Sequence, residues 1–252
     1  MNNRNDITFT DPLVMRITRP SPCSYLTGRV EQRLAADISS QPDNHDDLAK
    51  AGFRRVENWV YRPICAHCNA CKPLRIPSGN ITEGKLDLTK SQRRIIRKNA
   101  HITRDLLHNI CFDEHYALFQ TYLESRHSDG QMADMDKNSY AAMITSSPID
   151  TVLIEYRDQG GLYGVMLVDI QDDGLSLVYS FFDPDKQHLS PGSFMIMDCA
   201  AVAYHMGLPY VYLGYYIAAS HKMNYKSKFK PAEILSNGIW TPLSEANDSE
   251  QY

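Results

Sequence analysis

Three consecutive apolar runs in the second half of the chain place the tightest limit on its fold. The runs TVLIEY (151–156), LYGVMLVDI (162–170) and LSLVYSFF (175–182) are separated only by the turn segments RDQGG and QDDG. Connections this short join antiparallel neighbours, so the runs predict a three-stranded meander. An apolar helix over 193–205 and a strand over 209–216 follow. A meander, a helix and a further strand in this order predict an α+β fold.

The middle third of the chain carries helical patterns. Ser91 can cap a helix over QRRIIRKNA, residues 112–126 carry apolar positions at helical spacing, and residues 139–145 form a shorter helical segment. At the other end of the chain, the segment ILSNGIW predicts a final hairpin.

The N-terminal quarter carries a smaller pattern. Apolar residues recur every four positions over 24–38, at Leu26, Val30, Leu34 and Ile38. This spacing predicts an amphipathic helix. A short helix over 44–51, an extended segment over 53–65 and a strand ending at Pro77 follow.

The order of the C-terminal segments is similar to the core of a GNAT-like acyltransferase, which gives a prediction for the domains. We expect an N-terminal α+β domain over 1–80, a GNAT-like catalytic domain over 81–243 and a flexible tail over 244–252. The polar N-terminus MNNRND has no apolar signal-peptide core, and no run approaches the ~18 apolar residues that span a bilayer. We therefore expect a cytoplasmic protein without a membrane partner.

Cysteines are concentrated in the segment CAHCNACKPLRIP. Cys65, Cys68 and Cys71 are separated by two residues each, a spacing that lets thiolates converge on one metal centre. Cys23 or His67 would supply a fourth ligand. The sequence predicts a structural zinc ion or iron–sulfur cluster on Cys23, Cys65, Cys68 and Cys71, with three reduced thiols as the alternative. Cys111 and Cys199 are expected in the core.

The net charge of −4 conceals two cationic segments. Residues 90–104 carry six basic and no acidic groups, and residues 221–230 carry four basic and none acidic, so the rest of the chain has a charge of −14. Like charges at i,i+4 on one helix repel each other, and phosphates would offset that repulsion. The segments therefore predict contacts to a nucleic-acid backbone from Arg93, Arg94, Arg97, Lys98, Lys226, Lys228 and Lys230. A merely solvated helix face is the alternative.

The turn into the helix at 193 argues against coenzyme A. A GNAT enzyme that binds coenzyme A needs a glycine-rich turn whose N–H groups approach the pyrophosphate. The turn here is HLSPGSF, with a single glycine, Gly192, after Pro191, which has no N–H to donate. A coenzyme A-dependent acetyltransferase therefore stays only an alternative.

Several separated segments resemble the arginyl-tRNA–protein transferase family, and in particular its bacterial aspartate/glutamate leucyltransferase branch. The segments that carry the resemblance are PCSYL, GFRR, YRPICAHCNACKPLRI, SQRRIIRKN, RHSDGQM, LVYSFFDPD, LSPGSF, YLGYYIAASHKMNYKSKFKPAEIL and GIW. The resemblance implies transfer of an amino acid from aminoacyl-tRNA to the N-terminal amine of proteins that begin with Asp or Glu. It also implies a role in N-degron-dependent degradation, with downstream N-degron machinery as a partner.

The resemblance implies leucine as the transferred residue, with arginine as the alternative, and no cofactor for catalysis itself. Residues that match basic positions of the family's motifs are expected to bind substrate: Arg54, Arg55, His127 and Lys222. The loop RHSDG at 126–130 and the tyrosines of the strand at 209–216, Tyr215 among them, are expected to line a pocket that reads an anionic group, with a turn and a core strand as the alternatives. Asp183 and Asp185, in the turn after a central strand, are the candidates for accepting a proton from the attacking amine. A simple turn-forming role is the alternative for both. A non-enzymatic zinc RNA-binding module would explain the cysteines and basic segments but not an acyltransferase-like domain.

Overall fold

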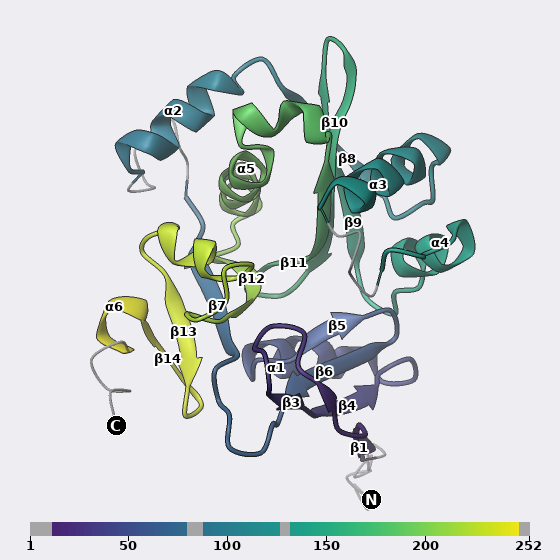
Figure 1. The fold of residues 1–252 in the computed structure, drawn as a ribbon, viewed down its shortest axis with the longest axis vertical. Helices are drawn as coiled ribbons and strands as arrows, with labels where there is room; N and C mark the ends of the chain where they lie inside the picture. The colour runs from purple at the N-terminus through teal and green to yellow at the C-terminus, as the bar shows by residue number, and fades with distance from the viewer. Residues whose placement is uncertain (1–11, 80–87, 127–131, 247–252) are drawn as a thin grey trace, which may run out of the picture.

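A large mixed sheet with helices on both faces and a small antiparallel sheet beside one end make up the molecule (Figure 1). The computed structural model describes residues 12–79, 88–126 and 132–246. No helix in these residues combines the length and apolar character needed to cross a membrane.

The large sheet has eight strands and contains the predicted meander. In spatial order they are β14 (Ile239–Pro242), β13 (Glu233–Ser236), β7 (Lys72–Pro77), β12 (Tyr210–Tyr216), β11 (Gly174–Phe182), β10 (Gly161–Ile170), β9 (Thr151–Asp158) and β8 (Thr103–His108). The pairings are antiparallel except between β11 and β12, which are parallel and connected through a helix. The meander, the helix and β12 follow the order of a GNAT-like domain, and the α+β prediction is confirmed.

Helices cover both faces of this sheet because its central strands are apolar on both sides. On β9 the neighbours Leu153 and Ile154 belong to different cores, as the period of two in a strand requires. Leu153 packs with α3 (Asp113–Arg126) and α4 (Lys137–Thr145). Ile154 packs with α5 (Pro191–His205), against which α2 (Lys90–Lys98) lies (Figure 1). The three helices predicted in the middle third and the helix at 193–205 are thereby confirmed. The predicted cap of the first is wrong, because Thr89 accepts the Gln92 N–H and Ser91 lies inside α2.

The small sheet has the order β1-β4-β6-β5 and is antiparallel throughout. Its strands are β1 (Met15–Ile17), β4 (Arg33–Asp37), β6 (Trp59–Pro63) and β5 (Arg54–Val56). Ala36, Ile38 and Val60 form its core. The short elements nearby are β2 (Ser21–Pro22), β3 (Val30–Glu31), η1 (Pro42–Asn44) and α1 (His45–Lys50). The prediction of a helix over 44–51 is confirmed.

The predicted helix over 24–38 is wrong. Gly28 interrupts the segment with a φ of +73°, and residues 33–37 form β4 between β1 and β6. Ala36 and Ile38 are buried, so a period of two describes these positions better than the period of four. Burial between two strands overrides the local helical pattern here.

The large sheet takes a strand from the predicted N-terminal domain. Strand β7 lies between β12 and β13, although its residues precede position 80. Strand β8, on the outer edge beside β9, was not predicted from the sequence. The first residues of the predicted tail, 244–246, belong to a short helix, α6 (Leu243–Ala246). Residues 247–252 lie outside the described part. The division at residue 80 stays a prediction.

Candidate active site

A cavity opens where β11 and β12 part. The two strands pair only over 174–176 and 210–212 and then diverge. A cavity of about 870 Å³ occupies the widening gap. Residues 177–180 of β11 line one side, and Leu213 and Tyr215 of β12 line the other. Most of the remaining described lining comes from the end of α3, the start of α5, the small sheet and the segment 221–226, with Tyr25, Phe182 and Gln187 in addition.

Arg54 extends from β5 into this gap and fills its narrow end. Its Nη2 donates to the main-chain oxygen of Leu177 at 2.6 Å and lies 3.4 Å from that of Val178. Gly214, on β12, has a φ of +77°, and a Cβ at this position would overlap the Arg54 guanidinium. The glycine therefore leaves room for the arginine, which is held against both diverging strands as a fixed positive charge.

Lys226 lines the same cavity from η3 (Asn224–Lys228). Its Nζ donates to the main-chain oxygen of Tyr215 at 2.7 Å, and the residue is only 7% exposed. Burial, with a smaller contribution from the Arg54 guanidinium, lowers the pKa of Lys226 to about 7. The Tyr215 hydroxyl lies 3.0 Å from the oxygen of Gly52 and 3.1 Å from that of Tyr61, which fixes β12 to the small sheet.

The cavity wall is rich in basic side chains. Besides Arg54 and Lys226, it includes Arg126, His221 and Lys222, and no carboxylate is among its described lining residues. The N-terminus of the 15-residue helix α5 also opens onto the cavity and adds the positive end of the helix dipole. Such a wall binds anionic groups.

Arg55 lies outside the cavity, in a buried ion pair. Its Nη2 and Nε donate to the two oxygens of Asp169 at 2.6 and 2.8 Å, and both side chains are 1% exposed. Its Nη1 donates to the main-chain oxygen of Glu57, and Thr151 donates to the same aspartate. The guanidinium cannot reach a substrate from this position, so the expected binding role of Arg55 does not fit the structure.

Asp183 and Asp185 are also absent from the described lining of the cavity. Asp183 caps η2 (Pro184–Leu189), and its Oδ1 accepts the Asp185 N–H at 3.0 Å. Asp185 is exposed. Their placement fits the turn-forming alternative and gives no support to a role as proton acceptor.

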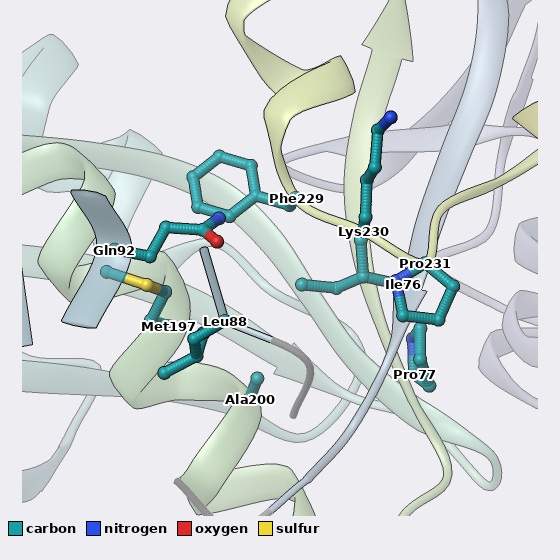
Figure 2. Close-up of a pocket in the computed structure, with 9 residues that line it drawn as sticks. All are labelled: Ile76, Pro77, Leu88, Gln92, Met197, Ala200, Phe229, Lys230 and Pro231. Carbon is teal, nitrogen blue, oxygen red and sulfur yellow. The ribbon is translucent and has the colours of Figure 1, made fainter. Parts of the chain in front are cut away.

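The two cationic segments of the sequence come together on the surface. Gln92 Nε2, on α2, donates to the main-chain oxygen of Lys228 at 2.9 Å. Figure 2 shows this contact region, with Phe229 beside Gln92 of α2 and Pro231 beside Ile76 of β7. The Lys230 side chain is directed away from both. Lys228 and Lys230 are exposed, as are the basic side chains of α2 at Arg93, Arg94, Arg97 and Lys98.

This basic surface reaches the cavity through the C-terminal end of α2. Lys98 Nζ donates to the main-chain oxygen of His188 at 3.3 Å, and Asn99 Nδ2 donates to that of Leu189 at 2.9 Å. Residues 190–193, which follow directly, line the cavity. Lys226 is separate from this surface because its amine is buried in the cavity, which does not fit the expected backbone contact. Arg104, on β8, is paired with Asp198.

Of the residues expected to bind substrate, Arg54, Lys222 and Tyr215 line the cavity, whereas His127 lies outside the described residues. The expectation that the loop beginning at Arg126 and the tyrosines of β12 share a pocket fits the placement of Arg126 and Tyr215. Further lining residues were not singled out from the sequence: Tyr25, Tyr61, Tyr122 and His221. Tyr25, Tyr61 and His221 lie in segments that carry the family resemblance, and this was the available signal.

The four N-terminal cysteines are neighbours. Burial, with smaller contributions from the thiols of Cys65, Cys23 and Cys68, raises the pKa of the Cys71 thiol to about 12. Four thiols grouped in this way are a donor set that suits zinc or an iron–sulfur cluster. As the side chains stand, no three His, Cys, Asp or Glu residues among those described are arranged to hold a metal ion.

Two family models cover most of the chain. The C-terminal model of the arginine-tRNA-protein transferases matches residues 114–236, and the N-terminal model matches residues 21–94. The chain belongs to this family. It is 46% identical over 242 residues to the aspartate/glutamate leucyltransferase of Ruegeria pomeroyi, covering 94% of this chain and 87% of the relative. It is 45% identical over 244 residues to the protein of the same name from Granulibacter bethesdensis, covering 95% and 89%.

Among solved structures, the chain is similar to L-PGS from Bacillus licheniformis. The TM-score is 0.45 and the sequence identity 7%, over 69% of this chain and 50% of that one.

Proposed function

We propose that the protein transfers leucine from leucyl-tRNA to the N-terminal amine of proteins that begin with Asp or Glu. The names of its relatives supply leucine and the Asp or Glu acceptor, and the matching family models supply a tRNA donor and a protein acceptor. The observation that carries the proposal is the cavity between β11 and β12, whose described wall has five basic side chains and no carboxylate. Such a cavity suits an anionic donor and an acidic acceptor, and it opens beside the basic surface of α2.

The donor is bound along the basic surface. Arg93, Arg94 and Arg97 are exposed on α2, and no described carboxylate forms an ion pair with them. Arginine and lysine side chains on this surface neutralise phosphates of the tRNA backbone, with release of counterions. The aminoacylated end of the tRNA then enters the cavity past residues 190–193. Lys98, Lys228 and Lys230 extend the same surface.

The acceptor is recognised by cations in the cavity. Arg54 is fixed by its bond to the Leu177 oxygen and keeps further N–H groups for a carboxylate. Lys222 lines the wall and is exposed, so it can follow acceptors of different length. An Asp or Glu side chain pairs with these cations, whereas an N-terminal Ala leaves them unpaired, and this difference gives selectivity.

The chemistry requires little more than positioning. The ester that joins the amino acid to the ribose is an activated acyl group, and an α-amine has a pKa near 8, so part of it is a free nucleophile at neutral pH. Holding the two substrates together is worth about 7–11 kcal/mol of the barrier. The product, a protein with a new N-terminal leucine, enters N-degron-dependent degradation.

One assay tests this function and separates it from its alternatives. Purified protein is incubated with leucyl-tRNA or arginyl-tRNA and with peptides that begin with Asp, Glu or Ala, and the products are identified by mass. We expect leucine on the Asp and Glu peptides only. Transfer of arginine would favour the alternative donor, and acetylation with acetyl-coenzyme A in place of tRNA would favour a different acyltransferase.

We propose further that Cys23, Cys65, Cys68 and Cys71 hold a structural zinc ion or iron–sulfur cluster. The support is the electrostatic interaction of Cys71 with the other three thiols and the two-residue spacing of Cys65, Cys68 and Cys71. The cluster lies beside the cavity, because Cys71 also acts on the pKa of Tyr215 and of Tyr25. A bound metal would hold the wall that these tyrosines form and would have no part in the transfer chemistry.

A further inference from the structure

Lys226 differs from the lysines that surround it in sequence. Lys222, Lys228 and Lys230 are exposed, whereas Lys226 is 7% exposed. Lys226 lines the cavity, and its amine donates to the Tyr215 oxygen. A buried ammonium is stable only when its charge is paired and its N–H groups are bonded. The structure gives Lys226 Nζ one hydrogen bond, to a neutral main-chain oxygen.

The surroundings of Lys226 also disfavour its charged form. The charged or titratable groups that line the same cavity are Arg54, Arg126, His221, Lys222, Tyr25, Tyr61, Tyr122, Tyr179, Tyr215 and Tyr225. None of them is a carboxylate, and Arg54 repels a charged Lys226. A neutral amine that donates one N–H to the Tyr215 oxygen keeps its lone pair, so it can accept a proton.

We propose that the ε-amino group of Lys226 is the catalytic base of the transfer and takes a proton from the α-ammonium group of the acceptor. The proposal rests on the transfer function argued above. It also fills the place left by Asp183 and Asp185, neither of which is among the described residues that line the cavity.

The proton and electron balance of the step is complete without a further reactant. Neutral Lys226 removes one proton from the acceptor α-ammonium, which becomes a free amine. The amine nitrogen forms a bond to the leucyl carbonyl carbon, and the bond from that carbon to the ribose oxygen breaks. A second proton from the same nitrogen ends on the ribose hydroxyl. Lys226, now an ammonium, returns its proton to solvent before the next turnover.

The pKa of Lys226 near 7 suits this role. A general base works best when its pKa is close to the working pH, because a useful fraction is then unprotonated and still basic. An ordinary lysine, with a pKa of about 10.4, would be protonated almost completely at neutral pH.

The test uses two substitutions of Lys226 and a matched control. Lys226→Met keeps the length of the buried chain without a base, and Lys226→Arg keeps a positive charge that does not deprotonate near neutral pH. Lys137→Met removes an exposed lysine of α4 that is paired with Asp113. Single-turnover transfer is measured at saturating leucyl-tRNA and Asp peptide, with tRNA affinity and melting temperature as checks of folding.

We expect both Lys226 variants to lose about 100-fold or more in the rate, the lower range for a general base, with tRNA affinity within threefold of the parent. Lys137→Met is expected to match the parent. A Lys226→Arg variant that keeps a third or more of the rate would overturn the proposal, because a fixed charge would then suffice. If the unmodified protein transfers no leucine to the peptide, the proposed function itself fails, which is a separate result.

A direct titration covers the case in which the variants do not fold. The full chain is prepared with ¹³C,¹⁵N-labelled lysine, each lysine side-chain resonance is assigned from its own backbone by triple-resonance experiments, and each is followed between pH 5 and 11. We expect one resonance to titrate near pH 7. A Lys226 signal that titrates near pH 10 would overturn the proposal.

Discussion

The Arg54 guanidinium occupies the space that a side chain at position 214 would need. Gly214 has a φ of +77° at the point where the register between β12 and β7 shifts. The same guanidinium donates to the Leu177 oxygen across the gap. The position of Arg54 in the gap between β11 and β12 therefore depends on glycine at position 214.

Gly214→Ala is expected to reduce leucine transfer strongly while lowering the free energy of unfolding only modestly. The added methyl group must displace Arg54, which would move the cation that pairs with the acceptor carboxylate. Gly207→Ala is the matched control, because Gly207 has a φ of +74° but open space around the added Cβ. Both variants should lose about 1–2 kcal/mol of stability from the left-handed backbone.

The measurements for this pair are KM for an Asp peptide and the free energy of unfolding in urea. We expect KM to rise at least tenfold in Gly214→Ala alone. Equal KM values in the two variants would contradict the role given to Arg54.

Arg55→Ala is expected to destabilise the packing of the small sheet against the large sheet. It is not expected to change the preference for Asp and Glu acceptors selectively. Removing one partner of a buried ion pair costs about 3–5 kcal/mol, because the other charge stays buried. Here Asp169 would lose both of its bonds to the guanidinium. Urea denaturation measures the loss. A variant with unchanged stability and selective loss of transfer to Asp peptides would restore the substrate-binding role.

The sequence predicts that the segment containing Arg54 and Arg55 belongs to the site, but it does not predict the different roles of the two arginines. Both match the same motif, but successive side chains of a strand point to opposite sides. Which of the two arginines faces the cavity depends on the ion pair between Arg55 and Asp169. Because Asp169 is 114 positions away from Arg55, the local sequence does not show this pair. The motif identified the strand, and long-range packing assigned the roles.

Elements with strong periodic patterns were predictable, and those set by neighbours were not. The meander β9 to β11, α5 and β12 have long apolar runs with short turns, and all five were predicted. Strand β8 was missed because its residues are largely exposed and show no alternation. The segment 24–38 carried a helical spacing that the pairing of β4 with β1 and β6 overrode. The basic character of α2 was readable directly, but its contact with Lys228 was not.

Binding of leucyl-tRNA is expected to weaken steeply with salt, and Arg97→Gln should reduce that dependence. Each phosphate contact contributes about 0.7 to 0.9 to the slope of log affinity against log salt. Arg97 is exposed on α2, so its loss should lower the slope by that amount with no change in melting temperature. Lys50→Gln, which removes a lysine paired with Asp172, is the control and should leave the slope unchanged. Identical slopes in the Arg97 variant and the parent would place the tRNA elsewhere.

Protein purified without oxygen is expected to contain about one zinc ion or one iron–sulfur cluster per chain if the four thiols act together. Cys71→Ser should lower the metal content at least fivefold and reduce stability, since Cys71 interacts with the other three thiols. Cys111→Ser, a cysteine outside this group, should leave the metal content unchanged. Metal analysis by mass spectrometry and ultraviolet–visible spectra provide the readout. Anaerobic protein without stoichiometric zinc or iron would refute the metal proposal.

Stability is expected to rise with pH above neutrality, and Lys226 is the group responsible. Burial and Arg54 lower its pKa to about 7 in the folded state, whereas an unfolded lysine has a pKa of about 10.4. Between these values the unfolded chain binds the additional proton, so the free energy of unfolding increases with pH by up to about 1.4 kcal/mol per unit. Below pH 7 both states are protonated, and this contribution no longer changes.

Urea denaturation of the parent and of Lys226→Met between pH 6 and 9 measures this effect. The variant has no amine to titrate, so its stability should depend less on pH above 7, by about that slope, and should exceed that of the parent most clearly at pH 6 to 7. Parallel curves for the two proteins would mean that Lys226 has an ordinary pKa in the folded state. The same result would remove the chemical basis for its role as a base, independently of any activity measurement.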